Sequence, residues 1–522
     1  MEEKELEKRK NELKDKIKSF LNNTDNVYLI AVLLFAFLIR IYYFFLTSHQ
    51  ALWWDEAEYM LKVKSIFFDI PVTGLAEIRE PVIPYIWSLF YLLGGEIGVR
   101  FFQIIMSLFT VFMTYVVGRQ LFNRKIGILS ALFMSVLSIP LFFTNRLLTY
   151  PWTSLIYLIV ISLFLIGIKN KNKYLYLSSA FLAIGLIAYF NTLFLIILFF
   201  LFLIFTERFK LFKEKRFIIS AIIFILVLAP FIIYYFITLG VPLPRFSQFQ
   251  IVSQGAVSGE YLPFSQWFGY IHQIPRILGH PSYFGLPLIF FAFLGILSLI
   301  EVVLGFDLIL KSKSEDLKNK FLLWLWILVP LFLLTIIEIV QKSTVFYDAF
   351  LHPIFPALSI ISAIGVISFF NFANKHTQKF SKIIIIILIL FVIISNLSYA
   401  NSMITNKMHS YDTLIDAGLW IKQNSNTYDK VLTQAIPEIT YYSERESLSI
   451  PREEVNLSVL INEEKPKFFV LTAWEAAASP RWSLDYAQKN PGKFIPIIAF
   501  PINSQQPTTI VFVINLSAFE QE

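Results

Sequence analysis

The chain has 522 residues, of which 56% are apolar and only 16% are charged, against about 25% charged residues in an ordinary soluble domain. With a mean hydropathy of +0.64 the composition excludes a soluble fold and indicates a polytopic α-helical membrane protein. The absence of cysteine excludes disulfides, thiolate metal sites and cysteine nucleophiles. The net charge of +7 is not a nucleic-acid signal, because Lys and Arg collect in loops on one side of the predicted spans.

The first 27 residues are charged and contain no apolar core segment, so we predict a cytoplasmic charged helix here and no cleavable signal peptide. A spanning helix needs about 20 mainly apolar residues, and eleven stretches after this segment fit. The predicted spans are 28–47, 100–120, 126–148, 151–168, 174–190, 193–206, 217–239, 283–306, 321–340, 353–370 and 383–400.

A shorter apolar stretch at 81–95 contains two prolines, and whether it spans decides the sidedness of everything after it. If it does not span, most Lys and Arg of the membrane part lie on the side of the amino terminus, as cytoplasmic loops require. We therefore predict an interfacial or re-entrant helix on the outer face. The resulting layout has a membrane domain at 28–400 with its amino terminus inside, and two long external loops at 48–99 and 240–282.

Residues 401–522 differ sharply from the membrane part, because they are slightly acidic and alternate between helical and extended patterns. Helices are predicted at 412–423 and 438–444, and strands at 430–435, 467–472 and 509–515. This alternation is typical of a small α/β domain, which the layout places outside the cell. The segment has no glycine-rich loop that would cradle a phosphate, so no nucleotide is assigned to it.

The strongest local signal is the Trp-Trp-Asp-Glu-Ala-Glu-Tyr segment at 53–59, which opens the first external loop. In a helix Asp55, Glu58, Tyr59 and Lys62 would share one face, while Glu56 would point elsewhere. A carboxylate at the lipid–water boundary can act as a general base, or can hold a metal or a polar ligand. The alternative is a solvated acidic helix end beside an aromatic interface belt.

A second charged cluster, Glu-Ile-Arg-Glu-Pro at 77–81, stands directly before the interfacial helix, so the chain could fold it back toward Asp55. Arg79 offers a fork of N–H donors that suits a phosphate. The alternative is an exposed loop that merely starts a helix, with Pro81 near its first turn.

Further cations are predicted on the outer side at Arg146, Arg245, Arg276 and Lys342, where a lipid phosphate would give them a role; singly, each could equally be solvated. Arg40 and Glu338 lie inside predicted spans and are candidates for the bundle interior. The few histidines do not form a convincing metal site, so no metal ligand is predicted.

Several of these segments resemble a known family. The carrying residues are Asp-Glu-Ala-Glu-Tyr at 55–59, the helix start at 81–85, Gly-Arg-Gln-Leu-Phe-Asn-Arg-Lys-Ile-Gly at 118–127, and Asn-Arg-Leu-Leu-Thr-Tyr-Pro at 145–151. In order and spacing they are similar to the polyprenyl-phosphate-sugar-dependent glycosyltransferases that include protein O-mannosyltransferases and the lipid A aminoarabinose transferases (glycosyltransferase family thirty-nine, of the GT-C class). The likeness covers about residues 28–400, and the tail resembles the soluble domain of prokaryotic members.

The resemblance implies that Asp55 lies at the catalytic centre, with Glu80 as the second catalytic acid, although Glu77 could be the equivalent residue instead. It implies that Tyr59 lines the sugar pocket. Many relatives have Asp or Glu where this chain has Tyr150, which leaves the sugar and the acceptor class open. Together with the charged and aromatic candidates above, the expected substrate-binding set is Glu56, Glu58, Tyr59, Glu77, Arg79, Tyr85, Arg146, Tyr150, Lys342 and Tyr347.

The expected activity is the transfer of a sugar from a polyprenyl-phosphate-linked donor, such as dolichyl phosphate mannose, to an acceptor outside the cell membrane. Asp55 would act as base and the product would be inverted. The acceptor is a glycan, a lipid or a protein; no nucleic acid and no definite cofactor are expected, and a divalent cation is left open. Alternatives are a lipid-linked sugar transporter or flippase, an oligosaccharide ligase, and a non-enzymatic assembly protein.

Overall fold

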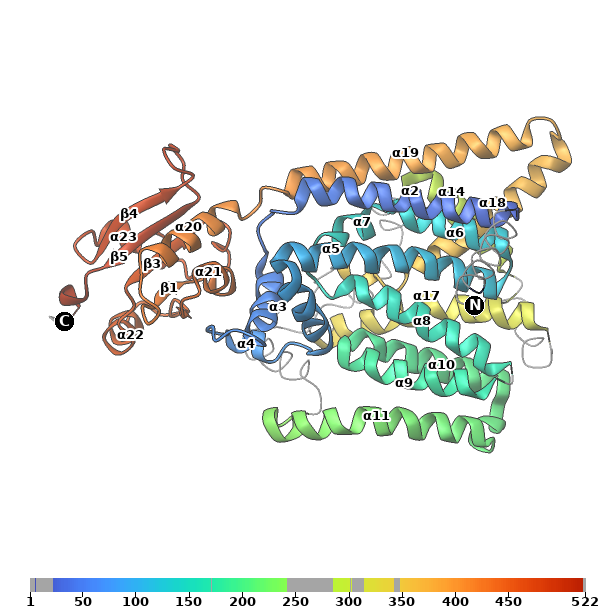
Figure 1. The fold of residues 1–522 in the computed structure, drawn as a ribbon, viewed down its shortest axis with the longest axis horizontal. Coiled ribbons are helices and arrows are strands. Elements are labelled where there is room, and N and C mark those ends of the chain that lie inside the picture. The colour runs from blue at the N-terminus through green and yellow to red at the C-terminus, as the bar shows by residue number, and fades with distance from the viewer. Residues whose placement is uncertain are drawn as a thin grey trace.

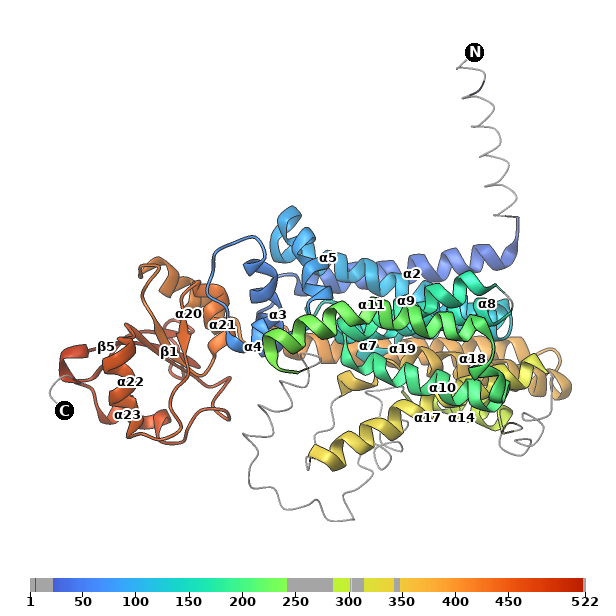
Figure 2. The ribbon, with the colours of Figure 1, turned by 90° about the horizontal axis from the view of Figure 1, so that it is seen from below.

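The computed structural model describes residues 5, 22–169, 171–241, 285–300, 302, 314–341 and 348–519. It has two parts, a bundle of apolar helices and a C-terminal domain beyond one end of the bundle (Figures 1 and 2). The charged amino-terminal segment and most of the predicted external loop at 240–282 lie outside the described residues. The fold class predicted from composition, a helical membrane part with a C-terminal α/β domain, is confirmed.

The helices of the first part are α2 (Thr24–Thr47), α3 (Trp54–Ser65), α4 (Gly74–Glu77), α5 (Val82–Leu121), α6 (Arg124–Val136), α7 (Ser138–Thr144), α8 (Tyr150–Ile168), α9 (Asn172–Ala188), α10 (Leu193–Glu207), α11 (Lys215–Leu239), α14 (Gly285–Ser298), α17 (Glu315–Gln341), α18 (Phe355–His376) and α19 (Ser381–Lys407). Short 3-10 turns lie at Phe190–Thr192, Arg208–Phe212 and Asp348–Leu351. In Figure 1, α2 and α19 run side by side along one edge of the bundle.

Eight helices among the described residues are long and apolar enough to cross a membrane, or nine if the bent pair α6–α7 counts as one span. The helices α9 and α14 are apolar but shorter. The predicted total of eleven spans is therefore not confirmed. The bundle packs around one large apolar core, and faces of α11 and α19 stay exposed, as lipid-facing helices do.

Helix α5 contains a sharp reversal where the sequence predicts the end of an interfacial helix. Gly94 and Gly95 leave helical geometry, and Gly95 has φ 59°, which glycine adopts without steric cost. The rings of Phe90 and Phe102 stack with centroids 3.7 Å apart, so the first part of α5 folds back on the second. A side chain at Gly98 would meet the Phe90 carbonyl oxygen at 2.5 Å, which explains the glycine there. The placement of this segment at the outer membrane face stays a prediction.

The predicted span at 126–148 is not one continuous helix but a bent pair of helices. Helix α6 ends at Val136, Leu137 has an extended ψ of 127°, and α7 leaves at an angle of 60°. Pro140 lies within the first turn of α7, and a proline there cannot continue the hydrogen bonds of the preceding helix. Residues 145–149 are not helical, and here Arg146 and Thr149 contact side chains of α3.

The C-terminal domain is a five-stranded sheet covered by helices on both faces. Its strands are β1 (Val431–Thr433), β2 (Ser447–Leu448), β3 (Phe468–Thr472), β4 (Phe494–Phe500) and β5 (Thr509–Ile514), in the order β2-β1-β3-β5-β4. The pairs β1–β2 and β1–β3 are parallel, and β3–β5 and β4–β5 are antiparallel. A 3-10 turn follows at Leu516–Ala518.

Helices α20 (Asp412–Gln423) and α21 (Ile436–Ser443) share one apolar cluster with the sheet, and α22 (Asn456–Glu464) and α23 (Ser483–Lys489) share the other. The predicted helix at 412–423 is confirmed. The predicted strands at 430–435, 467–472 and 509–515 and the helix at 438–444 are present with slightly shifted ends. The sequence patterns missed β2, β4, α22 and α23.

Helix α3 lies where the two parts of the molecule meet. Figures 1 and 2 both show α3 and α4 at the end of the bundle that faces α21. The backbone N–H of Leu52 donates to the Tyr442 hydroxyl at 2.9 Å, Tyr441 donates to Glu96 at 3.1 Å, and Lys64 pairs with Glu444 at 2.7 Å. The C-terminal domain therefore contacts the residues directly before α3 and the last turn of α3.

Candidate active site

The acidic segment forms the first turn of α3, and its local sequence explains why the helix begins there. Trp53 is the residue before the helix, and its backbone N–H donates to the Glu56 carboxylate at 2.8 Å. A glutamate three residues into a helix commonly satisfies this free N–H group. Asp55 and Glu56 in the first turn also suit the positive end of the helix dipole. The acids thus favour the helix that presents them.

Arg79 joins the two clusters that the sequence singles out. Its Nε donates to Glu58 at 2.7 Å, and its Nη2 donates to both Asp55 and Glu58. The guanidinium also lies over the Tyr59 ring at 4.8 Å, and Lys62 donates to the Arg79 carbonyl oxygen. The loop at 77–81 does fold back onto α3, and the predicted shared face of Asp55, Glu58, Tyr59 and Lys62 is confirmed.

Glu80 enters the site from the same loop. Its carboxylate accepts a hydrogen bond from the Tyr59 hydroxyl at 3.3 Å, and that hydroxyl accepts one from Thr149 at 3.1 Å. Its other oxygen, Oε1, is buried and has no hydrogen-bond partner among the described residues. Glu77 is exposed and contributes its carbonyl oxygen to Lys62 at 2.9 Å. Of the two candidates for the second acid, the geometry therefore favours Glu80.

Glu56 points to the opposite side of α3 and pairs with Arg146 at 3.1 Å. The carboxylate also accepts the backbone N–H of Leu147 at 2.6 Å, and Arg146 lies 3.7 Å over the Trp53 ring. Both side chains of the pair are sealed from solvent, at 0% and 1% exposure. This pair ties the start of α3 to the non-helical segment between α7 and α8.

Asp55 differs from its neighbours in being open. Its side chain is 39% exposed, whereas that of Glu58 is 1% exposed. One oxygen of Asp55 accepts from Arg79 and the other from the Tyr150 hydroxyl at 3.2 Å, so the carboxylate is held in one orientation. The Tyr150 ring contacts the rings of Tyr189 and Phe350, at centroid distances of 5.6 and 5.8 Å. An oriented and accessible carboxylate beside an aromatic wall can take a proton from a bound hydroxyl group.

The charges in this cluster are strongly coupled. Burial raises the pKa of Glu58, against the lowering effect of Arg79. Burial alone would lower the pKa of Arg79, but the charges around it, Asp55 first among them, raise it well above its ordinary value. Arg79 therefore stays protonated at every relevant pH. Burial lowers the pKa of Lys62 to about 8.

The other predicted site residues are not brought to this cluster. Tyr85 is 58% exposed on the first part of α5, and Arg146 reaches Glu56 but not Asp55. Arg40 is buried in the bundle and donates to Ser107 at 2.9 Å, as its position in a span predicts. The predictions for Lys342, Tyr347, Arg245, Arg276 and the side chain of Glu338 lie outside the described residues.

Three contributors to the cluster were missed by the sequence reasoning. Thr149 donates to Tyr59, the Trp54 indole donates to Glu58 at 2.9 Å, and the Tyr189 ring packs against Tyr150. Trp54 stands inside the acidic segment at 53–59, and Thr149 stands inside the segment at 145–151 quoted for the resemblance, so their positions were usable signals. Tyr189 had none, because only the break between α9 and α10 brings it to this place.

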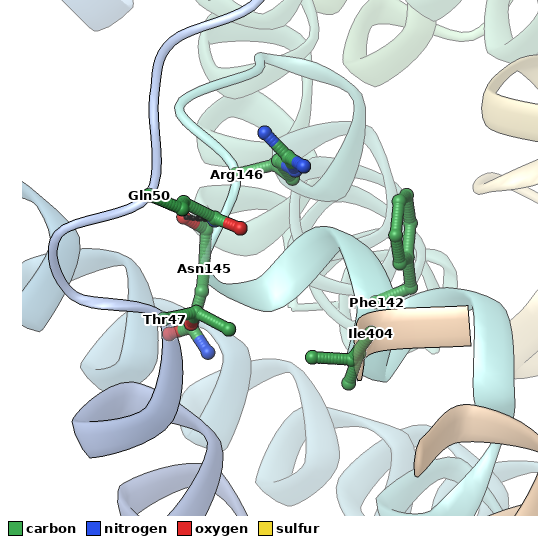
Figure 3. Close-up of a pocket in the computed structure, with 6 residues that line it drawn as sticks. All are labelled: Thr47, Gln50, Phe142, Asn145, Arg146 and Ile404. Atoms are coloured by element: carbon green, nitrogen blue, oxygen red, sulfur yellow. Dashed lines mark hydrogen bonds between the residues drawn. The ribbon is translucent and has the colours of Figure 1, made fainter. Parts of the chain in front are cut away.

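A small pocket next to the sealed pair is lined by Thr47, Gln50, Phe142, Asn145, Arg146 and Ile404, as Figure 3 shows. It lies between the end of α2, the segment after α7 and α19, and it does not include Asp55. Within the described residues, no group of three or more Asp, Glu or His side chains is placed to hold a metal ion.

Part of the chain matches the model of a known protein family. The family model described as dolichyl-phosphate-mannose-protein mannosyltransferase matches residues 79–234. The matched segment begins at Arg79 and includes Glu80, Arg146 and Tyr150, whereas Asp55 lies before it. A search of the curated proteins finds no match.

Among solved structures, the chain is similar to ArnT from Cupriavidus metallidurans in the apo state, with a TM-score of 0.62 and 12% identity over 94% of this chain and 98% of that one. It is similar to the same protein bound to undecaprenyl phosphate, with a TM-score of 0.61 and 11% identity over 93% and 97%. It is also similar to the Archaeoglobus fulgidus oligosaccharyltransferase tethered with an acceptor peptide, with a TM-score of 0.60 and 13% identity over 92% and 74%. The predicted GT-C fold is confirmed, and the family model that matches residues 79–234 is that of a glycosyltransferase.

Proposed function

We propose that this protein is a membrane glycosyltransferase that transfers a sugar from a polyprenyl-phosphate-linked donor to an acceptor hydroxyl outside the membrane. The observation that carries the proposal is the geometry of Asp55. This residue is the exposed member of a buried carboxylate cluster, and Arg79 and Tyr150 fix both of its oxygens. The similarity to ArnT, one structure of which is bound to undecaprenyl phosphate, supports a lipid-linked donor.

In the proposed reaction Asp55 removes the proton from the acceptor hydroxyl as its oxygen attacks the anomeric carbon. The bond between that carbon and the phosphate oxygen breaks, and the polyprenyl phosphate leaves with the electron pair. A phosphate leaving group of low pKa needs no general acid, so one base suffices, and a single displacement inverts the anomeric carbon. A positioned base typically contributes about 10²–10⁴-fold to such a step.

The contacts of Arg79 change one part of the expected mechanism. Its Nε and Nη2 atoms are occupied by Asp55 and Glu58. We therefore assign Arg79 to orienting the base rather than to binding the donor phosphate. The candidates for binding the donor phosphate are then Arg245, Arg276 and Lys342. These cations are predicted on the outer side, and they lie outside the described residues. The sugar, whether mannose or another, is not assigned.

The test is transfer by the purified full-length protein in vesicles with a radiolabelled polyprenyl-phosphate sugar and a panel of protein, glycan and lipid acceptors. We expect a labelled acceptor together with free polyprenyl phosphate, and at least a hundredfold loss of transfer in Asp55→Asn with unchanged thermal stability. A transporter would move the donor across the vesicle membrane without releasing polyprenyl phosphate. Undiminished transfer by Asp55→Asn would remove this residue from the mechanism.

A further inference from the structure

The C-terminal domain places a carboxylate of its own against the acidic cluster. Glu438, in the first turn of α21, is 0% exposed, and neither of its carboxylate oxygens has a hydrogen bond to another described residue. Buried carboxylates are nearly always paired or hydrogen-bonded, because an unpaired charge is poorly solvated inside a protein. An unsatisfied carboxylate at this place therefore needs an explanation.

The helical repeat shows which way Glu438 faces. Tyr441 and Tyr442 follow it by three and four residues and so share its face of α21. Both contact the membrane part, since Tyr441 donates to Glu96 and the Tyr442 hydroxyl accepts the N–H of Leu52. Glu438 thus faces the start of α3, on the surface by which the C-terminal domain docks.

The charges around Glu438 are negative. After burial, the charge of Glu475 in the segment after β3 raises the pKa of Glu438 most, and the charges of Glu58 and Asp55 on α3 raise it further. Glu475 itself accepts a hydrogen bond from Tyr411 at 2.9 Å. Arg79, the cation of the cluster, donates to Asp55 and Glu58 instead. Tyr411, just before α20, is a further titratable group near Glu438. Its pKa is raised by burial and by the charges of Glu475 and Glu438, and the charge of Arg146 acts in the opposite direction. An ionised Glu438 would be both poorly solvated and repelled.

We infer that Glu438 is a positioning residue for the catalytic cluster: as a neutral carboxylic acid it lets the C-terminal domain dock against α3, and its ionisation drives the domain away. The contacts that hold the domain are independent of this carboxyl group, namely Lys64 with Glu444, Tyr441 with Glu96, and Tyr442 with Leu52. Docking packs α21 against α3, which carries Asp55. The inference therefore concerns regulation of the proposed transferase site and, for its effect on catalysis, rests on that proposed function.

The direction of the pH dependence follows from the docked state. Burial, and next to it the charge of Glu475, raises the pKa of Glu438 well above its ordinary value. Undocking returns the group to water, where its pKa is about 4.3. The docked form therefore binds the proton more tightly. Docking is strongest at low pH and is lost as the pH rises through the raised pKa.

The chain has no native cysteine, so a pair of spin labels can be placed cleanly. We choose Asp69→Cys after α3 and Gln505→Cys between β4 and β5, which are both exposed. The labelled full-length protein is measured by pulsed electron spin resonance from pH 5.5 to pH 9. We expect one distance population at low pH and a growing second population, at longer distances, as the pH rises.

The neutral variant Glu438→Gln should show the docked population across the whole range, because it keeps the size of the side chain and removes its charge. The matched control is Glu446→Gln, the same change at an exposed position on the same domain, which should keep the wild-type response. A wild-type distance that does not change with pH, or an unchanged response in Glu438→Gln, would overturn the inference.

Transfer activity supplies the second readout. Wild-type kcat/KM should fall at alkaline pH in parallel with undocking, and Glu438→Gln should retain activity there, which a purely structural role would not produce. If the distances respond but no transfer is seen at any pH, the proposed function fails and the docking inference stands. If transfer is seen and the distances do not respond, the reverse holds.

Discussion

Two arginine–carboxylate pairs hold the first turn of α3, and they are built from neighbouring acids. Glu56 and Arg146 form an ion pair that is sealed from solvent. Glu56 also accepts the Leu147 N–H, and Arg146 lies over the Trp53 ring. Asp55 and Glu58 share Arg79, and here the Asp55 side chain is open to solvent. Neighbouring acids thus form a buried ion pair on one face of the helix and an accessible carboxylate, the proposed base, on the other. Exposure, rather than residue type, separates the two roles.

The largest effect on stability is expected at the sealed pair of Glu56 and Arg146. Arg146→Met should lower the free energy of unfolding by about 3–5 kcal/mol, because it leaves the Glu56 carboxylate buried without its partner. The measurement is the thermal unfolding midpoint of the purified protein, together with its yield as a monodisperse species. The double variant Glu56→Gln with Arg146→Met should recover part of the loss. A single variant as stable as the wild type would show that the pair has no structural role.

The open pair should respond in activity instead. Arg79→Lys keeps the charge but cannot reach both carboxylates with a planar fork, so Asp55 loses its fixed orientation. Hydrogen bonds to charged groups contribute about 1.5–3 kcal/mol, which corresponds to a loss of roughly 10–100-fold in kcat. The initial rate of label transfer at saturating donor measures it. An equal loss in Arg79→Met would show that position, and not charge alone, is what the site requires, whereas full activity in Arg79→Lys would contradict the orienting role.

The smallest effect is expected at Tyr150. Tyr150→Phe removes the hydroxyl that donates to Asp55 at 3.2 Å and keeps the ring contacts with Tyr189 and Phe350. Because this hydrogen bond is long and its carboxylate is open to solvent, we expect at most the lower end of the range for hydrogen bonds to charged groups, about 1.5 kcal/mol. The value of kcat should therefore fall by no more than roughly 10-fold, with an unchanged unfolding midpoint. Tyr150→Leu, which also removes the ring, serves as the contrast and should raise KM for the donor if the aromatic wall contacts the sugar. No change in either parameter for either variant would exclude Tyr150 from the site.

The site shows how far local sequence carries the argument. The helical spacing alone puts Asp55, Glu58 and Lys62 on one face and Glu56 on another, because side chains three and four residues apart lie together on a helix. The contacts of all four residues agree with this. The helical spacing could not decide between Glu77 and Glu80 as the second acid, because that depends on how the loop before α5 packs against Tyr59.

The spans show the same limit at larger scale. Apolar length locates α8 and α11 to within two residues at each end and also finds the end of α2, because each is a continuous helix facing lipid or core. Apolar length overlooks the break after Val136, although Pro140 in the sequence indicates one. It also predicts eleven spans, more than the described helices provide. Hydropathy measures burial in an apolar medium and is insensitive to a bend within that medium.

By itself the amino-acid sequence determined that this chain is a membrane protein, where most helices run and that a small α/β domain follows, and it singled out the acids at the start of α3 as candidates for the chemistry. These features depend on composition and on contacts between near neighbours in the chain. Only the tertiary structure decided that Arg79 serves Asp55, that Arg146 serves Glu56, and that Glu438 meets the cluster from the C-terminal domain. Those pairings join residues far apart in the chain, and burial, which no local pattern records, decides which carboxylate stays open.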